Sequence, residues 1–532
     1  MDMQTGIAFW FVTTVCLAGP IVSWFRLRNV PPGWCGVWAG IVAVALVGRL
    51  TGRPPIVGFA LALWILLVAV PIALANLGGR LTMQRRYPAA STALRLAALL
   101  HPADGFREAP AAIAALELAF QGDLDAADAA FERLRRSGSR STSTAVTMLC
   151  LLRQRWEDML AWAAAHPTAV ASEPNALVCV IRALGETGDV AGMIDRYDRA
   201  RQRIDRFRPV TLRDTCRLML FVFGGRTDVV DRILSTSFAA APPAQNDFWR
   251  ATARWAAGDT EAARREFDRL LPTADAISAV AIRRRLARID VQSPPLDDRG
   301  RRLLAAEEAR LDQEARYAPP VTPWSPRARV TRTLIAINVA AFAAEWLLGC
   351  LGDTNRMHDL GALCSGCVGR GEWWRLATST VLHWNALHLT LNMSALAILG
   401  PAAEAALGAS RFLAVYLFAG LGSMAAVVAV ARLRGEPCVC VGASGAVMGL
   451  VGGTAAMMLG GWLRERAEVA RGRGLSMVGF VAMQAALDAV VPQMSSTGHL
   501  AGAVLGFVAV LVLGDRLRGR TEQVVNCLPH EA

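Results

Sequence analysis

The stretch Val441-Gly-Ala-Ser444-Gly-Ala-Val-Met-Gly449 opens an apolar segment, residues 441–462, that is long enough to cross a membrane. Ser444 stands between Gly442 and Gly445, where the predicted helix starts. Glycines allow another helix or a peptide backbone to come close, and the first backbone N–H groups of a helix lack partners within it. A serine here can be a nucleophile beside an oxyanion site. Because Gly-x-Ser-Gly also occurs in simple helix packing, the pattern decides nothing without partner residues.

Candidate partner residues lie in two other segments. One is Gly371-Glu-Trp-Trp-Arg375-Leu-Ala-Thr-Ser-Thr-Val-Leu-His383-Trp-Asn-Ala-Leu-His388-Leu-Thr-Leu-Asn392, and the other is Gly498-His499-Leu-Ala-Gly502-Ala-Val-Leu-Gly506. His388 and Asn392 are four residues apart and share one helix face, and polar groups at membrane depth usually face the bundle interior. His499 starts another predicted span, which makes it a candidate general base for Ser444.

Taken together, the three segments resemble the rhomboid family of intramembrane serine proteases over about residues 327–516. The resemblance implies that Ser444 is the nucleophile and His499 the general base. It also implies an oxyanion hole formed by the backbone N–H of Ser444 with His388 and Asn392. No metal and no cofactor is expected, and the substrate would be a transmembrane protein in the lipid bilayer. Other matched positions are expected to support the site, namely Glu372, Arg375, His383, Gly442, Gly445, Gly502 and Gly506. Glu404 also matches a polar position of the family's second span.

Two positions need separate interpretation. Met448 lies one turn after Ser444, where the family often has an aromatic ring on the base histidine, so we expect Met448 to pack against His499. Asp488 precedes His499 by eleven residues. Because the family works with a Ser–His dyad, Asp488 is interpreted as a structural polar group. The close spacing of Gly502 and Gly506 is typical of tight helix packing.

The composition supports a membrane protein with a charged insert. Of the 532 residues, 54% are apolar and only 19% are charged, and the net charge is +12. The predicted fold is all-α and polytopic, with a six-helix core, about three N-terminal membrane helices and a soluble helical insert. The domains are expected at 1–79 (membrane), 80–317 (helical insert), 318–326 (linker), 327–516 (core) and 517–532 (tail). The predicted spans are 7–25, 33–48, 56–77, 330–350, 386–407, 411–431, 441–462, 474–491 and 498–514.

Arginines between the spans predict the orientation. By the positive-inside rule, the side of the membrane that carries most of these arginines is expected to face the cytoplasm, although Arg432 and Arg434 fall on the other side. The insert is then cytoplasmic, and Ser444 and His499 lie on the outer, extracytoplasmic side of a bacterial inner membrane. The charge follows membrane boundaries and solvated faces, so it does not indicate nucleic acid. The cytoplasmic set is Arg327, Arg329, Arg332, Arg411, Arg464, Arg466, Arg471, Arg473, Arg516, Arg518 and Arg520.

The insert contains a repeated pattern. Gly-Asp is followed five residues on by a small or apolar residue and nine residues on by an aromatic one, starting at Gly122, Gly188 and Gly258, with weaker copies at Gln154 and Gly225. The spacing is close to the 34 residues of a tetratricopeptide repeat (TPR). A TPR-like array would bind a protein or peptide partner, whereas an ordinary alanine-rich helical bundle is the alternative.

Cysteines and function each leave alternatives open. Cys364, Cys367, Cys438 and Cys440 fall on the outer side, where they could form a disulfide between the two loops, hold zinc or remain free thiols. For function, the alternatives to a protease are a catalytically silent membrane scaffold that recruits a partner through the repeats, and a transporter. A complete Ser–His pair favours the protease, and no inverted repeat indicates a transporter.

Overall fold

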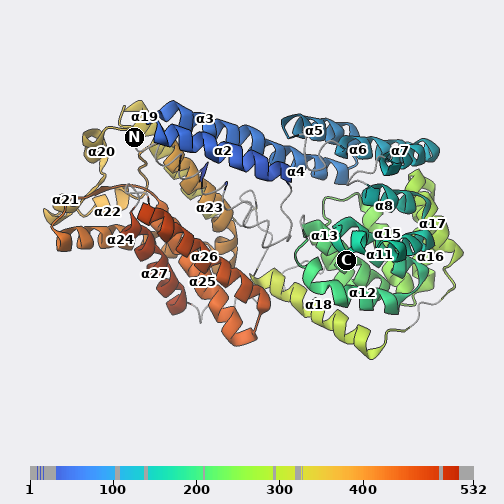
Figure 1. The fold of residues 1–532 in the computed structure, drawn as a ribbon. Coiled ribbons are helices and arrows are strands. Elements are labelled where there is room, and N and C mark those ends of the chain that lie inside the picture. Colours follow the sequence, from blue (N-terminus) through green and yellow to red (C-terminus); the bar gives the residue numbers. More distant parts are fainter. Residues whose placement is uncertain are drawn as a thin grey trace. The chain divides into compact units, whose positions relative to one another are not determined.

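The computed structural model of the chain is almost entirely helical (Figure 1). It describes residues 32–101, 108–136, 142–207, 210–291, 295–317, 328–490 and 495–513, with a few isolated positions besides. The chain divides into two compact units. The first unit covers Phe11–Glu308, and the second unit contains Ala309–Ala532. Among the described residues, seven helices are long and apolar enough to cross a membrane, which confirms an all-α polytopic architecture.

Two of these seven helices open the first unit. They are α2, Pro32–Leu50, and a continuous stretch, Pro54–Met83, made of α3 (Pro54–Trp64), the π-helix η1 (Ile65–Ala69) and α4 (Val70–Met83). The predicted spans 33–48 and 56–77 are therefore present. Apart from isolated positions, the predicted span 7–25 lies outside the described residues, as do the tail from 517 onward and, except for Ser325, the linker 318–326.

The rest of the first unit is an array of short helices joined by tight turns. Helix α11 packs against α9, α12 and α13, and α15 packs against α13, α14 and α16. The helices are α5 (Tyr87–Leu100), α6 (Ala109–Phe120), α7 (Leu124–Arg136), α8 (Thr142–Arg153), α9 (Trp156–Ala165), α10 (Pro167–Ser172), α11 (Pro174–Thr187), α12 (Val190–Ile204), α13 (Val210–Phe223), α14 (Thr227–Thr236), α15 (Pro243–Ala256), α16 (Thr260–Leu270), the 3₁₀ turn η2 (Leu271–Thr273), α17 (Ala276–Ala287) and α18 (Asp298–Tyr317).

All five predicted repeat starts occupy left-handed turns. The φ angles are 99° at Gly122, 53° at Gln154, 90° at Gly188, 67° at Gly225 and 91° at Gly258. Glycine adopts this conformation at little cost, whereas the side chain of Gln154 makes it less favourable. The repeat pattern therefore marks real turns between helices, including both weak copies.

The residues of the repeat pattern that follow each turn are buried. Asp189 and Asp259 accept hydrogen bonds from backbone N–H groups in the first turns of α12 and α16. The small or apolar positions and the aromatic positions are fully buried. Each of these three copies thus contributes a helix whose inner face packs against its neighbours. The buried positions are Ala127, Met193, Ala263, Phe131, Tyr197 and Phe267.

The second unit holds the other five membrane-length helices and a small extramembrane region. The long helices are α19 (Arg329–Leu347), α23 (Ala386–Leu407), α24 (Ala409–Arg434), α25 (Ser444–Glu465) and α27 (Ser496–Leu513). The short elements are α20 (Thr354–Leu360), α21 (Ser365–Gly369) and α22 (Arg375–Thr378), with strands β1 (Leu363–Cys364) and β2 (Val439–Cys440).

The predicted span 474–491 is only partly as expected. A helix is present there, α26, Glu468–Val490, and it packs against α25 and α27. It is not among the seven membrane-length apolar helices because Arg473, Gln484 and Asp488 lower its mean hydropathy. Two of these polar residues lie near His499, as described below.

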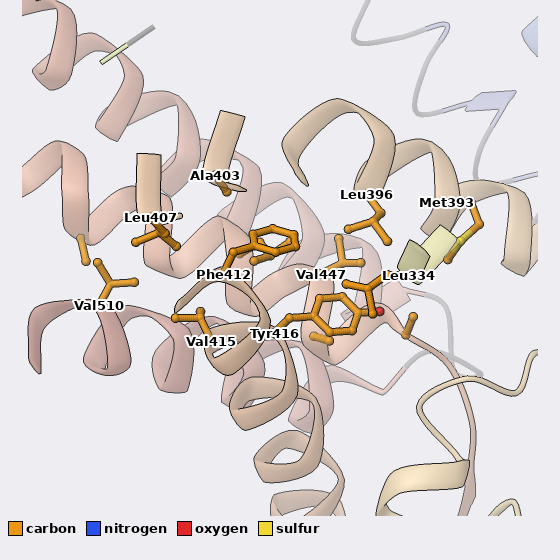
Figure 2. Packing of buried hydrophobic residues seen from close by; sticks show 14 of the residues in the cluster. Leu334, Met393, Leu396, Ala403, Leu407, Phe412, Val415, Tyr416, Val447 and Val510 are labelled. Atoms are coloured by element: carbon orange, nitrogen blue, oxygen red, sulfur yellow. The ribbon is translucent and has the colours of Figure 1, made fainter. Parts of the chain in front are cut away.

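A core of apolar side chains joins the helices of the second unit (Figure 2). Leu396 from α23, Phe412 and Val415 from α24 and Val510 from α27 belong to one buried cluster. The N-terminus of α19 is fixed to α23 by Glu404, whose carboxylate accepts hydrogen bonds from the backbone N–H groups of Val330 and Thr331 at 2.9 and 2.8 Å. These contacts hold the bundle around the site.

Glycines bring α25 and α27 into backbone contact. A Cβ added at Gly502 would lie 2.1 Å from the carbonyl oxygen of Gly445, and one added at Gly506 would lie 2.0 Å from that of Gly449. Both distances are far below van der Waals contact, so the small-residue spacing predicted for this helix is confirmed as a packing motif. This packing sets the distance between the helices that carry Ser444 and His499.

Replacing Gly502 with alanine is expected to force α25 and α27 apart and to destabilise the protein by about 1–3 kcal/mol. The measurement is the thermal unfolding midpoint in detergent. Gly479→Ala in α26 is the matched control because a Cβ there would meet nothing within 4 Å. Equal midpoints for the two variants would contradict the packing argument.

Candidate active site

Ser444 is the first residue of α25, directly after a strained turn. Gly442 has a φ of 132°, which favours glycine, and its N–H donates a hydrogen bond to the carbonyl of Ser379 at 2.8 Å. The next residues start the helix, whose first N–H groups have no acceptor within it and form the positive end of the helix dipole. The serine hydroxyl is therefore presented beside free backbone donors.

His499 lies against Ser444. The Nε2 atom of His499, in the first turn of α27, is 2.9 Å from the Oγ atom of Ser444. The imidazole is buried, with 6% of the residue exposed. The two residues are 55 positions apart in the sequence, and the predicted nucleophile and base are within hydrogen-bond distance of each other.

Asp488 contacts the other side of the same imidazole. Its Oδ2 atom lies 2.8 Å from Nδ1 of His499, and its side chain is only 1% exposed. Gln484, one turn earlier in α26, donates from Nε2 to Oδ1 of Asp488 at 2.7 Å. The fold of α26 brings the carboxylate of Asp488 directly to His499, while its interpretation as a structural polar group stays a prediction.

His388 and Asn392 face the turn that precedes Ser444. Asn385 caps α23 by accepting the backbone N–H of His388 at 2.9 Å. A Cβ added at Gly442 would lie 2.9 Å from Nε2 of His388 and 3.7 Å from Nδ2 of Asn392. The Nδ2 atom of Asn392 is buried and has no hydrogen-bond partner within the described part of the chain. An unpaired buried donor is costly, so its position here needs a functional explanation.

The observed contacts of His383 are with residues other than Ser444. Its backbone N–H donates to the carboxylate of Glu345 at 3.1 Å, and its Nδ1 lies 3.1 Å from the carbonyl oxygen of Val381. Its ring packs edge-on against that of His388, with centroids 5.1 Å apart. Burial lowers the pKa of His383 to about 4, so the imidazole is neutral near pH 7. These contacts position His388 from behind.

Arg375 and Glu372 join the segments of the outer loop. The guanidinium of Arg375 bonds Glu372 at 2.6 Å and also donates to the carbonyl oxygens of His358 and Ala362. Its hydrogen bond to Glu372 lowers the pKa of that carboxyl. The loop is further tied to the Ser444 turn by antiparallel pairing of β1 with β2, with Leu363 opposite Cys440.

The remaining predicted site residues are packing positions. Gly445 lets α24 come close, since a Cβ there would lie 2.1 Å from the hydroxyl of Ser423. Met448 is buried in a cluster with Val451 and Ala503. Its predicted contact with His499 is not among the interactions observed and stays a prediction.

The observed disulfide is not the bridge between two loops that was one of the expected alternatives. Cys364 and Cys367 form a disulfide within one loop, while Cys438 and Cys440 are free thiols. The β1–β2 pairing already joins the loops, so no covalent bridge is needed. Within the described residues, His358, Cys364 and Cys367 place possible metal-ligand atoms within 4.8 Å of one another. The disulfide occupies both sulfurs, which leaves the imidazole alone as a ligand.

Peptide mapping checks this pairing. Without reductant, we expect alkylation of Cys438 and Cys440 under denaturing conditions and a linked Cys364–Cys367 peptide. Reduction should add two further alkylation sites. Denaturation is needed because burial raises the pKa of Cys440 to about 11, and the protonated thiol reacts slowly. A peptide that links either of Cys438 or Cys440 to the loop of Cys364 would contradict the structure.

A bundle of membrane-length helices with a serine and a histidine in hydrogen-bond contact defines a polytopic membrane protein with a buried serine–histidine pair. Residues 370–516 match the family model described as Rhomboid domain. The segment before residue 370, including α19, lies outside the matched region.

Several curated relatives are similar to part of the chain. The chain is 32% identical over 185 residues to the Rhomboid protease GluP of Bacillus subtilis, a region that is 35% of this chain and 34% of that protein. RHOMBOID-like protein 5 of Arabidopsis thaliana is 33% identical over 160 residues, 29% of this chain and 50% of that protein. Rhomboid protease AarA of Providencia stuartii is 24% identical over 210 residues, 36% and 75% of the two chains. The chain thus spans about a third to a half of the length of the first two.

Proposed function

We propose that the protein is an intramembrane serine endopeptidase that hydrolyses a peptide bond in or next to a transmembrane segment of a membrane-protein substrate. The observation that carries the proposal is the 2.9 Å contact between Ser444 Oγ and His499 Nε2 at the start of two membrane-length helices. The rhomboid domain and the relatives named rhomboid proteases support it.

In the proposed reaction, Ser444 Oγ attacks the substrate carbonyl carbon while His499 Nε2 takes the hydroxyl proton. The carbonyl π electrons move to the oxygen, whose negative charge is stabilised by the backbone N–H of Ser444, by Asn392 Nδ2 and by His388. The imidazolium then protonates the leaving amine as the C–N bond breaks. Water, activated by His499, releases the acyl group and restores the serine.

The site lies at one end of the core bundle. Ser444, His388 and His499 each sit in the first turn of a helix, and the three helices α23, α25 and α27 alternate with α24 and α26 along the chain. Connections at the opposite end carry the arginines that predict the cytoplasmic side. We therefore place the site near the extracytoplasmic surface of the membrane, where an unwound substrate segment and water both have access.

The repeat region is proposed as a cytoplasmic TPR-like module that binds a protein or peptide. The five left-handed turns and the buried inner positions support the repeat assignment. A pocket between α7, α8 and α9 is lined by charged residues of both signs, including Asp128 and Arg153, together with Trp162. Such a surface suits a peptide with charged and apolar side chains.

A fluorophosphonate probe separates the protease from the silent scaffold. The detergent-solubilised full-length protein is expected to be labelled at Ser444 and to cleave a transmembrane reporter. Failure of the unmodified protein to do either would favour a scaffold that binds transmembrane helices without cutting them. The scaffold has no positive support from the site, because both the serine and its base are present and in contact.

A further inference from the structure

Asp488 has the geometry of a third catalytic-site member. Its carboxylate approaches Nδ1 of His499 with both oxygens, Oδ2 at 2.8 Å and Oδ1 at 3.0 Å. On the opposite side of the ring, Nε2 lies 2.9 Å from Ser444 Oγ. The three residues come from α25, α26 and α27, so they form a continuous hydrogen-bonded chain across three packed helices.

The contacts around the ring select one tautomer of His499. Gln484 Nε2 donates to Oδ1 of Asp488 at 2.7 Å and also lies 3.3 Å from Nδ1 of His499. Because an ionised carboxylate only accepts, its two short contacts with Nδ1 are satisfied when Nδ1 carries the proton and donates it to Asp488, while the Gln484 amide donates to the carboxylate at its shorter contact. Nε2 is then unprotonated and faces the Ser444 hydroxyl, as a general base requires.

The burial of the carboxylate also needs an explanation. Asp488 is 6% exposed as a residue, in a helix that packs against two membrane-length helices. Charged groups in such surroundings are expensive and are usually paired or functional. Two donors, Gln484 and His499, face the carboxylate of Asp488. The negative charge of this carboxylate would stabilise, at short range, the positive charge that the imidazole carries during catalysis.

We infer that Asp488 is a positioning residue that completes a Ser444–His499–Asp488 triad, so that this rhomboid domain works with three groups and not with a dyad. The inference rests on the proposed function. Asp488 holds the imidazole ring and the productive tautomer, and it stabilises the imidazolium formed when Ser444 attacks. It neither gains the proton nor touches the substrate.

The test is Asp488→Asn in the full-length protein. An amide of the same shape can donate to Nδ1 and so favour the tautomer with a proton on Nε2, which cannot accept from Ser444. We expect kcat for a transmembrane reporter to fall on the order of 10³–10⁴-fold with KM little changed, as in soluble triad proteases. Fluorophosphonate labelling should slow in parallel. Ser476→Ala, an exposed position on the same helix, is the matched control.

The outcomes are distinguishable. If the unmodified protein neither labels nor cleaves, the proposed function itself fails. If it is active and Asp488→Asn keeps kcat within about threefold, the triad is overturned and the dyad stands. Should the variant unfold, NMR of the unmodified protein with ¹⁵N-labelled histidine decides. A protonated Nδ1 and an unprotonated Nε2 on His499 support the triad, and the opposite tautomer overturns it.

Discussion

Ser444→Ala is expected to abolish proteolysis, with a fall in kcat of about 10⁴–10⁶-fold for a transmembrane reporter. The reason is that no other hydroxyl in the site lies within reach of His499 Nε2 among the observed contacts of the described chain, whereas Ser444 Oγ lies 2.9 Å away. Covalent labelling by a fluorophosphonate should be lost completely, since the probe reacts with an activated serine.

His499→Ala should give nearly the same loss, because the nucleophile and its base act as a unit and their effects are not additive. The measurement is reporter cleavage and probe labelling of purified variants with matched thermal midpoints. Ser476→Ala serves as the serine control because its hydroxyl is exposed and, in the described part of the chain, bonds the carbonyl of Gly472 one turn earlier in α26. Residual cleavage by Ser444→Ala at more than a hundredth of the normal rate would identify another nucleophile.

The sequence was sufficient for those parts of the site that lie in continuous motifs. Ser444 with its flanking glycines, and His499 with Gly502 and Gly506, each combine a chemical group with a packing requirement. Those patterns predicted both the contact between α25 and α27 and the residues it brings together. The repeat turns were predictable for a similar reason, since a left-handed turn strongly favours glycine.

Contacts that depend on helix rotation could not be read in this way. Asp488 is eleven residues from His499, and whether its carboxylate reaches the imidazole depends on how α26 is rotated against α27. The available signal in the sequence was an acidic residue within the predicted span 474–491, one turn after Gln484. The pairing of Cys364 with Cys367 likewise follows from a tight local turn, whereas the spacing alone also allowed bridges to Cys438 or Cys440.

The second large effect is expected at the proposed oxyanion site. Asn392→Ala removes the unpaired Nδ2 donor that points toward the Ser444 turn, and loss of one such donor typically costs about 10²–10³-fold in kcat. Because the donor acts mainly on the charged intermediate, KM should change little. His388→Ala should behave similarly, since Nε2 of His388 faces the same turn.

Thr390→Ala is the matched control for both variants. Thr390 lies on α23 between His388 and Asn392, its side chain is exposed, and its hydroxyl bonds the carbonyl of Ala386 within the same helix. Its replacement should leave kcat within about twofold. If Asn392→Ala raised KM without lowering kcat, the amide would bind the substrate in its ground state, and the oxyanion would have to be stabilised by the backbone N–H of Ser444 and by His388 without it.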